Sequence, residues 1–229
     1  LWDILAKSGY TADGLYIDLS IDSGSGYSTI SLEKARLFSK ERGLDLHVLD
    51  IQVEYGESIP QLFARSHPGD QKPCSTCGLV KRHELNRFAL QNGYTVLATG
   101  HNLDDEAAVL FSNTLSWNTS QLFRQHPVML ETSQLVRRIK PFVRFYERET
   151  TAYAILNGID YIEEECPFST GSRTNLHKSL LNKMEIEQPG LKYQFYHSFI
   201  EKKKAGLLNI SESQPYKEHY CEVCGQPTS

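Results

Sequence analysis

The feature that most constrains the fold is an alternation of short apolar segments with longer amphipathic ones. Three segments have the composition of buried strands, over residues 14–21, 44–51 and 94–99. Helical patterns follow them or lie between them, over residues 31–43, 57–66 and 79–93, with a further helix after Asn102. Strands that alternate with helices usually pair in parallel. The sequence therefore predicts an α/β fold with a mostly parallel sheet and helices on both faces.

The rest of the chain is predicted to be mainly helical. Ser31 is the expected N-cap of the helix over residues 31–43, and Pro189-Gly190 separates two C-terminal helices. Residues 209–218 have the composition of a linker. The expected elements of this part are an extended basic stretch at 136–143, a short strand at 159–162, and helices at 147–156, 174–187 and 191–205.

The composition excludes a membrane protein. The 40% hydrophobic and 23% charged residues are typical of globular proteins. No apolar run approaches the length of about 20 residues that spans a bilayer, and no secretory signal opens the sequence. We therefore expect no membrane partner and a cytoplasmic location.

The net charge of −4 does not indicate a nucleic-acid partner, but a local basic patch suffices for binding. Such a patch is expected to contact RNA phosphates, although a solvated basic face explains the same residues equally well. The candidates are Arg137, Arg138, Lys140, Arg144, Arg148 and Lys202–Lys204.

The five cysteines form two Cys-x-x-Cys pairs and one single residue. Cys74 and Cys77 form the first pair, Cys221 and Cys224 the second, and Cys166 precedes Pro167. A Cys-x-x-Cys spacing presents two thiolates from one turn, as metal and cluster sites require. The odd number favours thiols kept for metal over disulfides.

Cys74, Cys77 and Cys166 supply three thiolates without a fourth. This count favours a [4Fe–4S] cluster with one open iron, because zinc usually recruits a fourth protein ligand. Cys221 and Cys224 have the pattern of half a structural zinc knuckle. The simpler interpretation is that the first pair is inert and Cys166 is a buried apolar residue.

A second candidate site is the sequence Gly100-His101-Asn102-Leu103-Asp104-Asp105-Glu106, where a strand meets a helix. Open α/β sheets bind ligands at such junctions, and helix N–H groups favour phosphate. Gly100 would let the backbone approach a nucleotide, and Asp104 and Asp105 could hold Mg²⁺. Alternatively, the acidic residues merely complement the helix dipole.

Two further features are weaker on their own. The loop 22–27 joins a strand to a helix but lacks the lysine of a phosphate-binding loop, so it is interpreted as a flexible connection. Lys81 lies one helical turn beyond Cys77 and can therefore face the same cavity. A solvated helix lysine is the alternative for Lys81.

With these residues in view, the chain resembles the tRNA 2-thiolation enzymes of the PP-loop ATP pyrophosphatase superfamily, which share an adenine-nucleotide alpha-hydrolase-like fold. The likeness is greatest to the sulfurtransferases that make 2-thiouridine from 5-methyluridine in the tRNA T-loop. It spans nearly the whole chain, and its most specific strings are residues 73–82, 98–107 and 158–167.

The resemblance implies roles for individual residues. Cys74, Cys77 and Cys166 would ligate a [4Fe–4S] cluster, whose open iron would hold sulfide delivered by a ubiquitin-like thiocarboxylated carrier protein. Lys81 and Asp105 would be catalytic and would contact ATP, with Gly100 and His101 in the same nucleotide pocket. Mg²⁺ would accompany the ATP, and structural Zn²⁺ would bind Cys221 and Cys224.

The resemblance also implies the reaction and the partners. The family adenylates the C2 carbonyl oxygen of a tRNA uridine, and sulfur then displaces AMP. Relatives of this kind are commonly homodimers. The implied parts are a PP-loop catalytic domain over 1–165, a helical part over 166–208 that completes the cluster site, and a linker with half a zinc module over 209–229.

One departure concerns the family's Ser-Gly-Gly-Lys-Asp-Ser type phosphate loop, which the sequence lacks. Because residues 1–5 match the helix after that loop, we expect a fragment that has lost its first strand, this loop and the N-terminal zinc module. Such a fragment would bind ATP poorly and could be inactive. Rival interpretations are an anticodon uridine or cytidine thiolase, and a non-catalytic protein with one zinc tetrad of Cys74, Cys77, Cys221 and Cys224.

Overall fold

The computed structural model describes residues 1–21, 24, 26–66, 74–169 and 172–207, together with the strand residues 219–220 and 227–228. Two compact units account for its contacts. The first unit comprises residues 1–88 and 151–170, and the second comprises residues 89–150 and 171–229. Each unit is described by itself.

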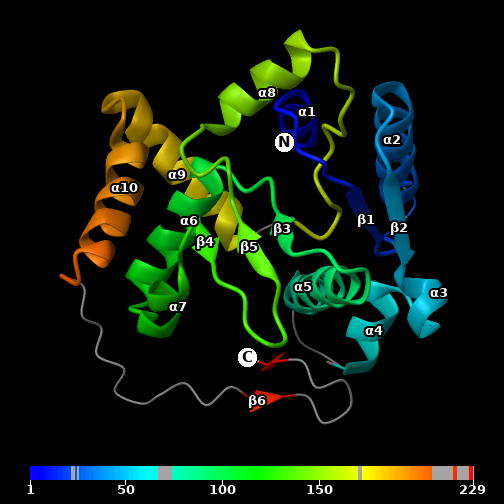
Figure 1. Cartoon of the computed structure of the whole chain (residues 1–229). Coiled ribbons are helices and arrows are strands. Elements are labelled where there is room, and N and C mark those ends of the chain that lie inside the picture. Colours follow the sequence, from blue (N-terminus) through cyan, green and yellow to red (C-terminus); the bar gives the residue numbers. More distant parts are fainter. Residues whose placement is uncertain are drawn as a thin grey trace. The chain divides into compact units, whose positions relative to one another are not determined.

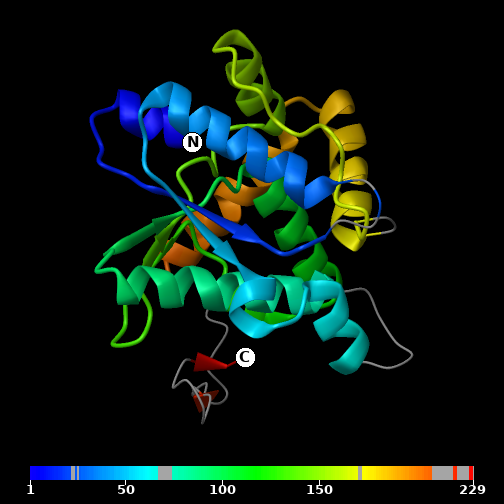
Figure 2. The ribbon, with the colours of Figure 1, turned by 90° about the vertical axis from the view of Figure 1, so that its right-hand side faces the viewer.

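The first unit is built on a parallel strand pair. β1 (Gly14–Asp18) pairs with β2 (Leu46–Asp50), and α2 (Tyr27–Arg42) connects them and packs on β1 (Figures 1 and 2). This arrangement is the βαβ unit that the alternation of patterns predicts. The other elements are α1 (Trp2–Lys7), α3 (Ile51–Tyr55), α4 (Ile59–Ser66), most of α5 (Cys74–Gln91) and the second half of α8 (Glu147–Leu156).

The first helix is fixed to this strand pair by close packing. A Cβ atom at Gly14 would lie 2.4 Å from the Trp2 ring, so only glycine fits at the start of β1. The Trp2 indole donates a hydrogen bond to the carbonyl of Ala12 at 2.7 Å. Asp3, which is buried, accepts from the Tyr153 hydroxyl at 2.6 Å and so ties α1 to α8.

The second unit contains a three-stranded sheet and a group of helices. β3 (Val96–Ala98) pairs in parallel with β5 (Arg137–Ile139), and β4 (Val128–Met129) pairs with β5 in the antiparallel direction. The other elements are α6 (Leu103–Leu115), α7 (Thr119–Arg124), the start of α8, α9 (Arg173–Glu187), α10 (Leu191–Lys204), and the antiparallel strands β6 (His219–Tyr220) and β7 (Pro227–Thr228).

Helix α6 is the centre of the second unit. Leu103 and Leu110 pack with residues of α7 and α10, while Ala107 and Ala108 pack against Leu181 of α9. Figure 1 shows α6 beside α9, α10 and α7. The two alanines let α9 approach closely, because they add little volume at the contact. The acidic residues at the start of α6 are therefore held by a packed core.

The structure confirms the α/β class and the parallel pairing, and it corrects three boundaries. Helix α2 begins at Tyr27, after Gly26 in the left-handed region, so Ser31 is not its N-cap. Residues 159–162 form no strand. Ile51 starts α3, because the Asp50 carboxylate accepts from the amides of Gln52 and Val53 and ends β2.

Within the described parts of the chain, no helix has both the length and the apolar character to cross a membrane. The three functional parts over 1–165, 166–208 and 209–229 do not coincide with the two compact units and stay a prediction.

Candidate functional site

Two of the predicted cysteines and Lys81 lie on the first turns of one helix. Helix α5 begins at Cys74. Cys77 follows three residues later, and Lys81 follows four residues after Cys77. This spacing places the three side chains along one side of the helix. Cys77 is half-buried, whereas Cys74 and Lys81 are exposed. The local order is therefore the one expected from the sequence.

The third cysteine comes from a turn that contacts the start of this helix. The amide of Ser169 donates to the carbonyl of Cys166 at 2.8 Å and closes a tight turn through Pro167. The Cys74 thiol donates to the carbonyl of Phe168, in the same turn, at 3.5 Å. The turn that carries Cys166 therefore lies against Cys74, and all three cysteines belong to the first unit.

The surroundings of Cys77 influence its ionisation. Burial raises the pKa of Cys77, the ammonium of Lys81 opposes this rise, and the charges of Cys166 and Cys74 add to it. Burial likewise raises the pKa of Tyr27, the first residue of α2, with further contributions from Cys166 and Cys77. Cys77 is thus within electrostatic reach of Cys74, of Cys166 and of the Lys81 cation.

The number of these thiols bears on whether they could hold a zinc ion or an iron–sulfur cluster. Among the described residues, no three His, Cys, Asp or Glu side chains are arranged as ligands of a single ion. Sulfurs around one tetrahedral zinc lie about 3.8 Å apart, from a Zn–S bond of about 2.3 Å. A cluster cube holds its thiolates further apart, because each binds a different iron. A set of three thiolates is therefore compatible with a cluster, in which each thiolate binds a different iron.

The predicted zinc ligands cannot be located in the structure. Cys221 and Cys224 lie outside the described residues, as do Asp22, Ser23 and Ser25 of the glycine- and serine-rich loop.

The second candidate site begins at the N-terminus of α6, in the second unit. Asn102 is the N-cap: its side-chain oxygen accepts from the Asp105 amide, and the Asp105 carboxylate accepts from the Asn102 amide, both at 3.0 Å. This reciprocal pair is a capping box, which satisfies two amides that the helix leaves unpaired. Asp105 therefore has a structural role in addition to the predicted catalytic one.

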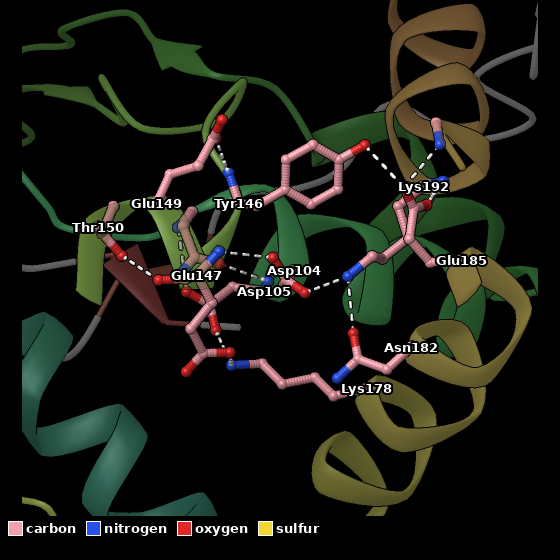
Figure 3. A network of polar contacts seen from close by, with 12 residues as sticks. Asp104, Asp105, Tyr146, Glu147, Glu149, Thr150, Lys178, Asn182, Glu185 and Lys192 are labelled. Atoms are coloured by element: carbon pink, nitrogen blue, oxygen red, sulfur yellow. Dashed lines mark hydrogen bonds and ion pairs between the residues drawn. The ribbon is translucent and has the colours of Figure 1, made fainter. Parts of the chain in front are cut away.

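The second carboxylate oxygen of Asp105 contacts Lys178 of α9. The distance from Lys178 Nζ to Asp105 Oδ1 is 2.6 Å, and the same nitrogen lies 3.2 Å from Glu147 Oε2 (Figure 3). Burial alone would lower the pKa of Lys178, but the bonds to Asp105 and Glu147 outweigh it and raise the pKa. Because the Asp105 side chain is 28% exposed, its carboxylate remains accessible.

Asp104 differs from its neighbour because it is buried, at 4% exposure. One of its oxygens forms a very short ion pair with Lys192, and the other accepts from the Glu147 amide at 2.7 Å (Figure 3). Lys192 also donates to the Asn182 side chain at 2.6 Å. Both oxygens of Asp104 are thus engaged within the protein. Asp104 as a ligand of Mg²⁺ therefore stays a prediction, made for a buried carboxylate that already pairs with an ammonium group.

Glu106, the third acidic residue, is also engaged inside the unit. Lys140 Nζ lies 2.8 Å from its carboxylate, and the Gln125 amide and the Tyr196 hydroxyl each lie 3.4 Å from it. Burial and the charge of Glu106 raise the pKa of Tyr196, so the phenol stays protonated. The three consecutive acids therefore do more than complement a helix dipole, and only Asp105 faces solvent appreciably.

Gly100 and His101 lie in the turn between β3 and α6, and both are exposed. A Cβ atom at Gly100 would meet no atom within 4 Å, so open space adjoins its backbone. The His101 ring contacts the Thr99 hydroxyl at 2.9 Å. Desolvation and the charge of Lys140 lower the pKa of His101, which favours the neutral imidazole at pH 7. Gly100, His101 and Asp105 share the second unit, whereas Lys81 belongs to the first.

Glu185 connects this network to the end of α9 and gives a testable pH dependence. Burial would raise its pKa, but hydrogen bonds from the Lys192 and Gly190 amides and the Tyr146 hydroxyl lower it. The resulting stabilisation is present above the ordinary value of 4.5 and is lost as the pH falls through the lowered pKa.

We expect Glu185→Gln to flatten the acid limb of stability against pH, by at most about 1.4 kcal/mol per pH unit for one proton. Urea unfolding at several acidic pH values measures this slope. Glu187→Gln, an exposed residue two positions along α9, is the matched control. An unchanged acid limb in Glu185→Gln would contradict the assignment.

Known proteins share this arrangement of elements and motifs. None of the protein-family models matches the chain. A tRNA-5-methyluridine(54) 2-sulfurtransferase from Thermus thermophilus is 45% identical to it over 229 residues, which cover all of this chain and 68% of the relative. The chain belongs to this family. The 2-sulfurtransferase of the same name from Pyrococcus horikoshii is 40% identical over 226 residues, or 99% of this chain and 69% of the relative.

A solved structure supports the fold. The U34-tRNA thiolase NcsA from Methanococcus maripaludis, whose structure includes its [4Fe–4S] cluster, is 24% identical and has a TM-score of 0.74. The alignment covers 94% of this chain and 65% of that one. At this identity the likeness establishes the α/β fold of the 2-sulfurtransferase family and nothing further.

Sequence reasoning missed several residues of these sites. Lys178 and Lys192 were assigned only to helices, although they are the cations that contact Asp105 and Asp104. Tyr27 falls in the predicted loop 22–27, although the charges of Cys166 and Cys77 contribute to its raised pKa. The capping box could have been found, because Asn102 and Asp105 have the required spacing of three residues.

Proposed function

We propose that this chain contributes to ATP-dependent 2-thiolation of a tRNA uridine. The carbonyl oxygen at C2 would attack the α-phosphorus of ATP and release pyrophosphate. Sulfur would then bond to C2, and AMP would leave with the former carbonyl oxygen. Adenylation is needed because a carbonyl oxygen is otherwise a poor leaving group. Membership of the 2-sulfurtransferase family is the observation that carries this proposal.

Cys74, Cys77 and Cys166 are the proposed ligands of a [4Fe–4S] cluster. When bound, the cluster would supply the sulfur for transfer. The contact between Cys74 and the turn of Cys166, and the influence of both of these cysteines on the pKa of Cys77, support this ligand set. Lys81 lies beside Cys77, where its charge would favour thiolates over thiols and stabilise negative charge that develops nearby.

Gly100, His101 and Asp105 are proposed to contact ATP, as is Lys81. The open space at Gly100 permits close approach of a ligand to the backbone, and the exposed Asp105 oxygen suits Mg²⁺. A nucleotide complex that engages Asp105 would compete with Lys178, which already holds one of its oxygens. The proposal therefore includes a rearranged Asp105–Lys178 pair in the ATP-bound protein.

The remaining proposals concern partners and location. A ubiquitin-like thiocarboxylated carrier would deliver the sulfide, zinc would bind Cys221 and Cys224, and two copies would form a homodimer. The location is proposed to be cytoplasmic. A relative from Yarrowia lipolytica named cytoplasmic tRNA 2-thiolation protein 1, 31% identical over 194 residues, supports that location.

Substitution of Asp105 tests the nucleotide part of the proposal. We expect Asp105→Asn to lower ATP-dependent thiolation at least about a hundredfold, because the amide keeps the cap acceptor but loses the charge. The assay supplies the protein with ATP, tRNA and a sulfur donor. Thiolated nucleosides from digested tRNA are identified by mass spectrometry, which also locates the modified uridine.

The control is Asp105→Ala, which should lose both the activity and about 1 kcal/mol of stability through the cap. If Asp105→Asn retains full turnover, the catalytic assignment of Asp105 is wrong. Thiolation of an anticodon uridine instead of a T-loop uridine would favour the rival thiolase. No thiolation by the unaltered protein with ATP, tRNA and a sulfur donor would contradict the proposed function itself.

A further inference from the structure

We propose that an aromatic hollow on α10 binds an unstacked nucleotide of the RNA substrate. This inference rests on the proposed function, because it assumes that tRNA is the substrate. The hollow lies wholly in the second unit and has a volume of about 50 Å³. We call it the α10 hollow, and the residues that matter for the argument are Arg144, Tyr193, Tyr196, His197, Glu201 and Lys204.

The floor of the α10 hollow is apolar and rigid. Tyr196 and Ile200 are buried at 4% and 6% exposure and belong to the hydrophobic core around α6. Val143, from the segment after β5, packs on the same core and also lines the hollow. A floor anchored in this way does not need to rearrange when a ligand binds, so less free energy is lost to ordering.

Two rings at the rim offer a stacking surface. Tyr193 and His197 lie one turn apart on α10, with ring centroids 5.2 Å apart and planes inclined by only 14°. Tyr193 is 37% exposed. Bases that are splayed out of an RNA loop stack on aromatic side chains of this kind. The exposed and nearly parallel rings therefore suit the flat face of a nucleobase.

The charges at the rim suit the rest of a nucleotide. Arg144 and Lys204 are exposed cations beside the rings, as phosphate contacts require. Glu201 lies 3.1 Å from Lys204 and 4.0 Å from His197, and its pKa is lowered chiefly by Lys204, so it is ionised at pH 7. A carboxylate can accept a hydrogen bond from the amino group of a base such as cytosine.

Several of the basic residues predicted to contact RNA form ion pairs or hydrogen bonds within the protein. Lys140 pairs with Glu106, Arg137 pairs with Glu131 at 2.9 Å, and Lys203 donates to backbone carbonyls at the end of α7. Those three side chains are engaged in contacts within the protein. Arg144 and Lys204 line a hollow that also contains aromatic rings, and Lys204 pairs there with Glu201 at 3.1 Å. Cations beside aromatic rings favour RNA over a purely apolar peptide as occupant.

The test measures binding of an unmodified tRNA transcript by this chain at two salt concentrations. We expect Tyr193→Leu, which keeps an apolar side chain but removes the ring, to weaken binding about tenfold. Tyr193→Phe should bind like the unaltered chain. Lys204→Ala should weaken binding and reduce its salt dependence by about one phosphate contact. The matched controls are Tyr10→Ala and Lys183→Ala, which remove an exposed ring and an exposed cation elsewhere.

A second measurement tests Glu201. Short oligocytidine should bind more tightly than oligouridine of equal length, and Glu201→Ala should remove that difference. If the chain binds tRNA but Tyr193→Leu and Lys204→Ala leave the affinity unchanged, the α10 hollow is not a nucleotide site, and the proposed function stands. If the unaltered chain binds no tRNA, the proposed function fails as well. Equal binding of both oligonucleotides contradicts the role of Glu201.

Discussion

Cys166→Ser is expected to abolish assembly of an iron–sulfur cluster on this chain. Serine keeps the size of the side chain but removes the thiolate that the cluster needs. After anaerobic reconstitution with iron and sulfide, the iron content should fall below about a tenth of that of the unaltered chain. The oxygen-sensitive visible absorbance should disappear with it. All three proposed ligands lie in one compact unit, so this experiment requires neither ATP nor tRNA.

The same experiment separates the cluster from the rival zinc tetrad. A tetrad of Cys74, Cys77, Cys221 and Cys224 predicts one zinc per chain, no brown colour and no effect of Cys166→Ser. The cluster predicts that Cys221→Ser leaves the visible absorbance intact. Zinc and iron analysis of both variants therefore gives opposite patterns under the two hypotheses.

A change near Cys166 that spares the thiol is the matched control. Ser169 lies in the same turn, and its hydroxyl donates to Glu165 at 2.8 Å. We expect Ser169→Ala to keep the iron content and the absorbance within about twofold, because the Ser169 hydroxyl contacts Glu165 and not the cluster, so that its loss acts only indirectly on ligation. If Cys166→Ser retains full iron content while Ser169→Ala behaves normally, the three-cysteine ligand set is wrong.

The convergence of the three cysteines shows where sequence reasoning reaches its limit. The spacing of Cys74 and Cys77 is local, so the helix and its common face could be predicted. The position of Cys166 depends on a contact across more than 90 residues, between Cys74 and the carbonyl of Phe168. No periodicity encodes such a contact. The cysteine count and the resemblance to a known family suggested the grouping, but neither gives the contact.

The acidic residues of α6 illustrate the same limit within one short segment. Asp104, Asp105 and Glu106 are chemically similar, and the sequence gives no basis for telling which are buried. The distinction comes from Lys192 and Lys140, which lie 88 and 34 residues away in the chain and reach Asp104 and Glu106. The parallel strand pairing was predictable because runs of β-branched and apolar residues alternate with helical patterns.

Lys192→Met is expected to be the most destabilising single change in the second unit. Lys192 and Asp104 are both about 5% exposed, and their ion pair is buried between α6 and α10. Removal of one partner leaves an uncompensated buried charge, which costs about 3–5 kcal/mol of unfolding free energy. Urea denaturation followed by circular dichroism measures this loss.

A matched lysine on α9 provides the control. Lys178 is 21% exposed and pairs with the partly exposed Asp105, so solvent compensates for the lost pair. Lys178→Met should therefore cost no more than about 1 kcal/mol. If the two substitutions cost the same, the Asp104–Lys192 pair is not a buried structural contact.

The double variant Asp104→Asn with Lys192→Met shows whether the charge itself is responsible. It removes both charges, so it should recover part of the stability that Lys192→Met loses. The coupling energy from the single and double variants measures the interaction between the two side chains.

Asp104 and Asp105 are adjacent on the first turn of α6, so the buried pair also fixes the position of the exposed carboxylate (Figure 3). On the proposal that Asp105 contacts Mg·ATP, a Lys192→Met protein that still folds should bind Mg·ATP less tightly than the unaltered chain, because the Asp105 carboxylate is then less well positioned.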